Sequence, residues 1–108
     1  MVSIIWRQTQ HIKSENWDPL EDMEKKFLAA EKRIGFPVET KTRHRALFGS
    51  NGVNTLVIDY KWESMAKMEK VITKALLDPE YQKLSDQVYP LIEDSKWEIF
   101  VQWPAFPK

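Results

Sequence analysis

The chain contains no cysteine, which excludes disulfide bonds, thiolate metal sites and cysteine nucleophiles. Glycine is also scarce, and Gly35, Gly49 and Gly52 stand at predicted turns rather than in a phosphate-binding loop. The sequence has no serine nucleophile elbow. No histidines or acidic residues have the spacing of a zinc or calcium site. The sequence therefore predicts neither a metal ion nor a tightly bound cofactor.

An excess of one charge sign is missing too, because Lys+Arg and Asp+Glu both number 16. Nucleic acid is therefore not an expected partner, since phosphate binding needs a basic excess on one face. No apolar run approaches the roughly 20 residues that cross a bilayer. The N-terminal residues 1–7 also lack the pattern of a secretory signal. By elimination, the expected location is the cytoplasm, with no membrane partner.

Aromatic residues are plentiful, with five Trp, five Phe and three Tyr in 108 residues, and they provide ample apolar area for a core. This length predicts a single domain over 1–108, of which the proline-rich residues 104–108 form a C-terminal tail. A lone domain of this size buries only about two-thirds of its unfolded surface. Sharing a face with a second subunit would enlarge its core.

Local signals predict four strands and two helical stretches in the order β-α-β-β-α-β. Asp18 with Pro19 starts the first helix and Gly35 ends it, while Ser64 starts the second stretch, which Asp78-Pro79 divides. Asn51-Gly52 predicts a hairpin turn. The predicted strands are residues 2–8, 39–48, 53–62 and 96–103, and residues 9–16 form a loop.

This element order predicts a ferredoxin-like α+β fold. Right-handed crossovers and the central hairpin give one antiparallel sheet in the spatial order 4-1-3-2, with the helices on one face. The opposite face of the sheet, called the open face below, then has no cover within the chain. The open face is the feature from which a function is inferred.

Alternate residues of a strand point to opposite faces of the sheet. The more apolar set is expected to face the helices: Val2, Ile4, Trp6, His44, Ala46, Phe48, Leu56, Ile58, Tyr60, Trp97, Ile99 and Val101. The open face then carries Ile5, Arg7, Arg43, Arg45, Leu47, Val57, Asp59, Glu98, Phe100 and Gln102. This face is too apolar to stay in water and too charged for a dry core. We therefore expect a homodimer in which two open faces enclose a partly polar cavity.

The predicted cavity suggests a small organic ligand. Arg7, Arg43 or Arg45 would meet an acid group, and Val57 and Phe100 would meet a carbon skeleton. The alternative is that these charges lie at a solvated face or pair with each other across the dimer.

Two residues are candidates for acid–base chemistry. A desolvated Asp59 carboxylate would have a raised proton affinity and accept a proton from a substrate, or else it pairs with Arg7 or Arg45. His44 has the chemistry of a general base near neutral pH, or else it is a structural strand residue.

Residues 48–69, FGSNGVNTLVIDYKWESMAKME, resemble the hairpin-strand-helix segment of dimeric α+β barrel proteins, especially NIPSNAP-like ones. Residues 77–84 and 97–100 resemble later segments of the same proteins. The resemblance implies a homodimer whose two sheets form a barrel. That superfamily includes haem-degrading enzymes and antibiotic biosynthesis monooxygenase-like enzymes that need no cofactor. No catalytic set of theirs maps onto this chain, and neither His11 nor His44 lies where a haem ligand is expected.

Three functions stay open at this point. The first is a homodimeric barrel that binds a small, partly apolar organic molecule. The second is a cofactor-independent monooxygenase on the same scaffold, so the sequence does not decide whether the protein is an enzyme. The third is a protein-interaction module that presents strand edges or the tail Pro104–Lys108 to a partner.

Overall fold

The helices begin and end within about two residues of the local signals, whereas several strand ends differ by more. The computed structural model describes residues 4–49 and 52–102. Its strands are β1 (Ile4–Ile12), β2 (Thr42–Arg45), β3 (Thr55–Trp62) and β4 (Ile92–Val101), and its helices are α1 (Trp17–Ile34), α2 (Met65–Leu77) and α3 (Pro79–Val88). Short 3₁₀ turns cover Ser14–Asn16, Val38–Thr40 and Tyr89–Leu91. The suggested role of the tail Pro104–Lys108 lies outside the described residues.

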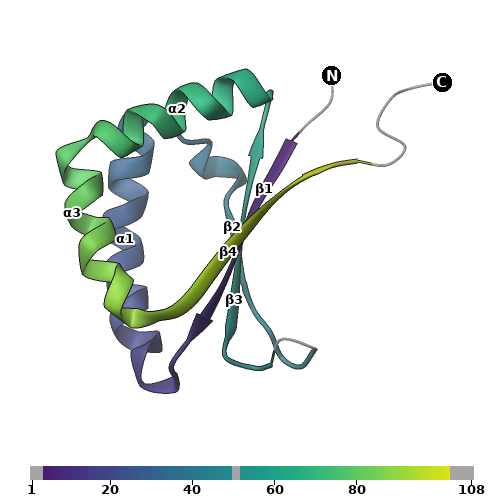
Figure 1. Ribbon diagram of the computed structural model, residues 1–108, viewed down its shortest axis with the longest axis vertical. Coiled ribbons are helices and arrows are strands. Elements are labelled where there is room, and N and C mark those ends of the chain that lie inside the picture. The colour runs from purple at the N-terminus through teal and green to yellow at the C-terminus, as the bar shows by residue number, and fades with distance from the viewer. Residues whose placement is uncertain (1–3, 50–51, 103–108) are drawn as a thin grey trace.

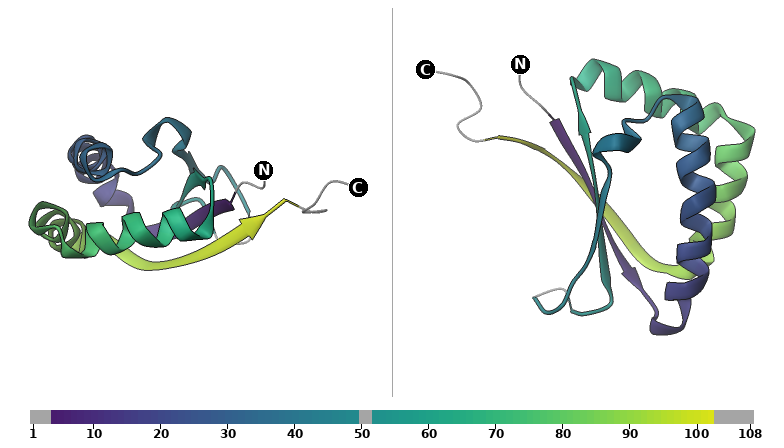
Figure 2. Two further views of the ribbon diagram at one scale, coloured as in Figure 1. Left: turned by 90° about the horizontal axis from the view of Figure 1, so that it is seen from above. Right: turned by 180° about the vertical axis from the view of Figure 1, so that it is seen from behind.

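One antiparallel sheet in the order β2-β3-β1-β4 confirms the predicted topology. Figure 1 shows this sheet nearly edge-on, with all three helices on one side of it. The views in Figure 2 show that the other side carries no helix. The ferredoxin-like α+β fold therefore has an open face, as the element order predicts.

The helix ends follow from capping chemistry. Ser64 Oγ accepts a hydrogen bond from the Lys67 amide at 3.1 Å, and Asp78 Oδ1 accepts one from the Tyr81 amide at 3.0 Å, as expected for N-caps. Gly35 ends α1 with a φ of 121°, where a side chain would be strained. The start of α1 differs from the prediction, because its N-cap is Asn16 rather than Asp18.

Two strands are longer than predicted and two are shorter, since β3 begins at Thr55 instead of residue 53. β1 continues through residues 9–12, which were expected to form a loop, because Ile12 is fully buried there. β4 begins at Ile92 instead of residue 96. β2 is limited to four residues because the segment before it forms a 3₁₀ turn. In these segments, tertiary packing decides over local composition.

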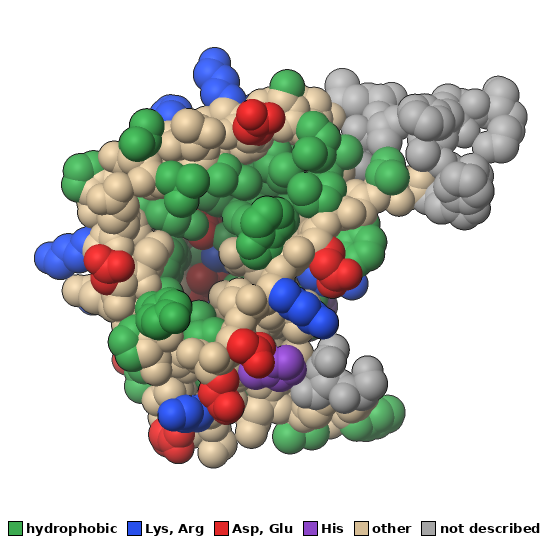
Figure 3. Space-filling view, viewed as in Figure 1, with side chains coloured by type: hydrophobic (Ala, Val, Ile, Leu, Met, Phe, Trp, Pro, Cys, Tyr) green, Lys and Arg blue, Asp and Glu red, His purple; other side chains and the backbone are tan. Residues whose placement is uncertain are grey.

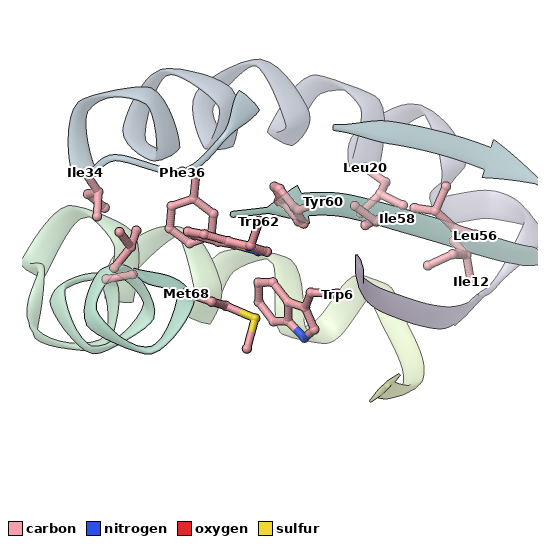
Figure 4. Close-up of a cluster of buried hydrophobic side chains, with 12 residues drawn as sticks. Trp6, Ile12, Leu20, Ile34, Phe36, Leu56, Ile58, Tyr60, Trp62 and Met68 are labelled. Atoms are coloured by element: carbon pink, nitrogen blue, oxygen red, sulfur yellow. The ribbon is translucent and has the colours of Figure 1, made fainter. Parts of the chain in front are cut away.

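The core lies between the sheet and the helices, and Figure 4 shows its side chains. Its densest part is aromatic. The Phe36 ring centroid lies 5.6 Å from those of both Tyr60 and Trp62, and Trp6 stacks on Tyr60 at 5.5 Å. These contacts hold β1 and β3 against the segment that follows α1.

The outer edge strand β4 is less buried than the sequence predicts. Trp97 and Ile99 pair with Gln8 and Trp6 in the ladder and therefore share the helix side of the sheet, as predicted. Their exposed fractions are nevertheless 62% and 40%. The reason is visible in Figure 2, where β4 curves away from the helices at the edge of the sheet.

The predicted orientation of β2 is wrong by one residue. Arg43 pairs with Ile58, and Arg45 pairs with Leu56, so both arginines share the helix side of the sheet. His44 pairs with Val57 and lies on the open face instead. Phe48, which was assigned to the core, lies beyond the strand and is 83% exposed. A one-residue shift exchanges the two faces of a strand.

Candidate functional site

A cavity of about 130 Å³ lies between the sheet and the helices. Figure 3 looks into a hollow between the helices and the sheet, where a rim of hydrophobic side chains surrounds acidic and basic ones at the bottom. We call this cavity the inner cleft. It is lined by Gln8, Gln10, Leu20, Met23, Glu24, Phe27, Glu31, Lys41, Arg43, Leu56, Ile58, Tyr60, Tyr81, Ser85, Val88 and Ile92.

Strand β1 explains why the cleft is polar in part. Its helix-facing residues are apolar at both ends, but Gln8 and Gln10 occupy the middle. Helix α1 adds two carboxylates from the same side, Glu24 and Glu31, which are seven residues apart and therefore share a helix face. A continuous apolar layer is thus interrupted at the centre of the molecule.

Glu31 is the centre of a buried hydrogen-bond network. Its Oε2 accepts a 2.6 Å hydrogen bond from the Tyr60 hydroxyl, and its Oε1 lies 3.1 Å from Lys41 Nζ. Lys41 Nζ also lies 2.8 Å from Glu24 Oε2. The side chains of Glu31 and Lys41 are only 3% and 4% exposed. Buried charges of this kind persist because each has a partner of opposite sign.

Burial changes the proton affinities of this network. Desolvation raises the pKa of Glu31, and the opposing effects of the Lys41 charge and the Tyr60 hydrogen bond do not cancel it. Burial, followed by the nearby Glu31 charge, holds the pKa of Tyr60 well above its usual range. Tyr60 is therefore a proton donor in its hydrogen bond, and Glu31 binds a proton more strongly than an ordinary glutamate does.

Arg43 contacts two acidic side chains of α1. Its Nη1 donates a 2.9 Å hydrogen bond to Glu21 Oε2, while its Nε lies 3.5 Å from Glu24 Oε2. Within the described ranges, Arg43 Nε and Trp62 Nε1 are the buried side-chain donors with no hydrogen-bond partner. Such atoms are rare in folded proteins, and this one belongs to a residue that lines the cleft.

The open face gathers four of the predicted ligand-binding residues. Arg7 donates two 2.9 Å hydrogen bonds to Asp59, and its guanidinium lies 5.1 Å from the Phe100 ring centroid. The predicted pairing of Asp59 with Arg7 is therefore confirmed. Val57 lies on the same face, opposite His44 of β2. The acidic and basic groups of this cluster are bound to each other.

The two other predicted ligand-binding residues lie elsewhere. Arg43 lines the inner cleft on the opposite side of the sheet. The guanidinium of Arg45 lies 4.1 Å from the Trp17 ring centroid, and its Nη2 donates a 3.2 Å hydrogen bond to Asn54 Oδ1. Arg45 therefore joins the β2–β3 connection to the start of α1.

The remaining titratable candidates do not form a metal site. His11 Nδ1 contacts Asp94 Oδ1 between β1 and β4. Across residues 4–49 and 52–102, no group of three or more potential metal ligands comes together. In the same ranges, no helix combines the length and the apolar character needed to cross a membrane.

Comparison with known proteins finds similarity in structure alone. No protein family model and no curated protein sequence matches the chain. A NIPSNAP family protein from Agrobacterium tumefaciens superimposes with a TM-score of 0.78 at 14% identity, over 93% of this chain and 85% of that one. An uncharacterized NIPSNAP-like domain protein from Burkholderia xenovorans gives 0.75 at 16% identity, over 98% and 90% of the two chains.

The chain has the fold of NIPSNAP proteins. An antibiotic biosynthesis monooxygenase-like protein from Deinococcus radiodurans is also similar, with a TM-score of 0.64 at 14% identity over 90% of this chain and 89% of that one. The resemblance first noticed in residues 48–69 is thus confirmed as a likeness of fold. At these identities the NIPSNAP fold carries no catalytic residues across, so the chemistry must come from the chain's own side chains.

Sequence reasoning missed Gln8, Gln10, Glu24, Glu31 and Lys41. A signal for the glutamates was present, because Glu24 and Glu31 share a helix face with the apolar Phe27. The two glutamines were detectable as polar residues on the helix-facing alternation of β1. Nothing local to Lys41 marks it for burial, because its partners come from α1.

Proposed function

We propose that the protein binds a small, single-ring organic molecule carrying an oxygen acceptor in the inner cleft. The observation that carries this proposal is a cavity of about 130 Å³ whose lining combines apolar side chains with the cationic Lys41 and Arg43. An engineered apolar cavity of about 150 Å³ in another protein holds benzene. The inner cleft is close to that volume, so a single ring is the size of ligand that it suits.

The chemistry of the walls favours a molecule with one apolar and one polar end. Phe27, Leu56 and Ile58 provide the apolar contacts. Lys41 and Arg43 add positive charge to the lining, which would favour a carboxylate, phenolic or carbonyl oxygen through a charge-assisted hydrogen bond. This assignment places the ligand on the helix side of the sheet, rather than on the open face where the sequence suggested it.

The binding test uses 4-hydroxybenzoate as the probe and follows backbone amide signals by NMR during titration. We expect signals of cleft residues to shift. The Arg43→Met variant should weaken binding by about 10-fold or more, the loss of one charge-assisted hydrogen bond. Arg45→Met is the matched control, because Arg45 lies on the same side of β2 but contacts Trp17. Equal affinities of Arg43→Met and wild type, or shifts confined to the open face, would contradict the proposal.

We also propose that two chains pair through their open faces. This face combines Phe100, which is 38% exposed, with the half-buried Ile5 and Val57 and with the ion pair of Arg7 and Asp59. Because Arg7 and Asp59 are already paired with each other, a second copy would bury these two charges without isolating either one. In sedimentation experiments, Phe100→Glu should yield monomers at concentrations where wild type is dimeric. Monomeric wild-type protein would disprove this assembly.

A cofactor-independent monooxygenase is a second candidate, favoured by the position of Glu31 on a ring-sized cavity. A buried carboxylate with a raised pKa is suited to deprotonate a phenol, and an electron-rich phenolate can react with oxygen. Oxygen consumption with hydroquinone tests this reaction. We expect wild type to consume oxygen faster than Glu31→Gln, and equal rates would exclude it.

A further inference from the structure

Gln8 and Gln10, on the sheet wall of the inner cleft, have side-chain amides to which no described residue is hydrogen-bonded. We propose that these two glutamines select the ligand of the cleft, a small cyclic amide that carries an N–H and a C=O on one edge of its ring. This inference rests on the proposed binding of a single ring in the same cleft. It adds the chemical group by which that ring is recognised.

Both amides can be reached from the cleft. Gln8 and Gln10 are half-buried, and both line the cavity. Across the described part of the chain, the buried side-chain atoms without a hydrogen-bond partner belong to Arg43 and Trp62. The amide atoms of the two glutamines are unpaired but are not among these buried atoms, so they keep accessible surface. A ligand can therefore contact them without displacing a protein group.

One ligand can reach both glutamines because they are neighbours on one face of β1. They are two residues apart in an extended strand, which places their Cα atoms about 7 Å apart. Gln8 pairs with Ile58 of β3 in the ladder, and both residues line the cleft. The same is true of Gln10 and Leu56. The two amides thus stand beside an apolar floor, and a ring lying on Ile58 and Leu56 would present one edge to them.

The chemistry of a carboxamide favours a ring that carries both a donor and an acceptor. Each glutamine offers N–H donors beside a carbonyl acceptor. An amide in an open chain is trans, so its N–H and C=O point to opposite sides, whereas a small ring holds them on the same side. The edge of a cyclic amide can therefore donate to a glutamine carbonyl and accept from a glutamine NH₂ group together. Glutamine reads the edge of adenine in DNA by the same pairing of donor and acceptor.

The loss of water from these amides makes the match selective. Accessible amides are hydrated when no ligand is present, and a ring that fills the cleft replaces that water. A cyclic ketone can accept a hydrogen bond from a glutamine NH₂ group, but it has no N–H for the glutamine carbonyl, which would then lose its hydrogen bond. A cyclic amide restores both bonds. The cleft should consequently prefer a cyclic amide to a ketone of the same ring size.

The test compares two probes of equal ring size, 2-piperidone and cyclohexanone, of which the first has an N–H where the second has a CH₂ group. Each probe is titrated into the full chain, and NMR follows the side-chain NH₂ signals of Gln8 and Gln10 together with the affinity. We expect 2-piperidone to bind about 10-fold more tightly than cyclohexanone, the effect of one hydrogen bond. It should also shift the NH₂ signals of both glutamines.

Substitution of both glutamines should remove this preference and keep the ring site. Methionine has nearly the shape of glutamine but makes no strong hydrogen bond, so the double variant Gln8→Met/Gln10→Met should bind the two probes with equal affinity. Thermal melts of this variant should show no loss of stability, because no hydrogen bond to a described residue is removed. Gln87→Met, an exposed change on α3, is the matched control and should retain the preference of wild type.

The outcomes separate this inference from the proposed function. Recognition by the glutamines is disproved, and binding of a ring stands, if wild type binds the two probes equally or binds 4-hydroxybenzoate but not 2-piperidone. A preference that survives in the double variant disproves it as well. If neither these probes nor 4-hydroxybenzoate binds in the cleft, both proposals are disproved. The comparison of the two probes on wild type needs no substitution, so it decides the matter even if the double variant does not fold.

Discussion

Arg7 and Asp59 stand directly opposite each other on β1 and β3, and Arg7 Nε and Nη2 each donate a 2.9 Å hydrogen bond to the carboxylate. This two-pronged geometry is among the strongest forms of an ion pair, although both side chains remain partly exposed. We expect a double-mutant cycle of Arg7→Ala and Asp59→Ala to give a coupling energy of about 1 kcal/mol in the free energy of unfolding. Urea denaturation at pH 7 measures it. A coupling near zero would mean that solvent screens the pair completely.

The buried Glu31 predicts an unusual pH dependence of stability. Its pKa is raised above the ordinary value of 4.5 in the folded protein, so the folded state binds its proton more tightly than the unfolded state. Stability from this group is then fully present below pH 4.5 and is lost as pH rises through the folded pKa. Wild type should therefore lose stability relative to Glu31→Gln between pH 4 and pH 8. Urea denaturation of both proteins across this range checks the sign, and a relative gain with rising pH would contradict it.

Sequence patterns predicted the sheet order and the N-caps of α2 and α3, but not the N-cap of α1. Ser64 and Asp78 stand directly before their helices, and the hairpin and crossovers leave little choice of topology. The orientation of β2 was not predictable in this way, because its residues Thr42–Arg45 are polar on both faces. A strand without an apolar alternation gives no preference for either face.

The inner cleft escaped prediction for a different reason. Glu31 shares a helix face with the apolar Phe27, but its charge favours an exposed position, and Lys41 follows it by ten positions in a polar segment. Their burial depends on Tyr60, which β3 brings to the same place. Only the folded chain joins these three segments, whereas the ion pair of Arg7 with Asp59 was foreseeable from neighbouring strands of known order.

The two N-caps should respond differently to acid. Ser64→Ala should cost about 1 kcal/mol of stability at any pH, because a hydroxyl does not titrate in this range. Asp78 also accepts two 2.9 Å hydrogen bonds from Arg33, which together with the cap lower its pKa from 3.8 to about 2.

Stability from Asp78 is thus present above pH 3.8 and is lost as pH falls through about 2. Thermal melts of Asp78→Ala and Ser64→Ala from pH 6 to pH 2 make the comparison. The loss in melting temperature relative to wild type should shrink on acidification for Asp78→Ala and stay constant for Ser64→Ala. If both losses change in the same way with pH, Asp78 is not the titrating cap.

Arg45 should stabilise the β2–β3 connection rather than bind a ligand. Its guanidinium lies 4.1 Å from the Trp17 ring centroid, and both side chains donate 3.2 Å hydrogen bonds to Asn54 Oδ1. Arg45→Ala removes the cation–π contact and two exposed hydrogen bonds, to Asn54 Oδ1 and to the Val53 carbonyl, so we expect a loss of about 1 kcal/mol in the free energy of unfolding. It should also speed hydrogen exchange at the Ala46 amide, which donates to the Thr55 carbonyl beside this contact.

Lys25→Ala, at an exposed position of α1, controls for the loss of a long cationic side chain and should leave both measurements unchanged. If Arg45→Ala matches this control in stability and in Ala46 exchange but loses affinity for 4-hydroxybenzoate, Arg45 belongs to a binding site and not to the connection.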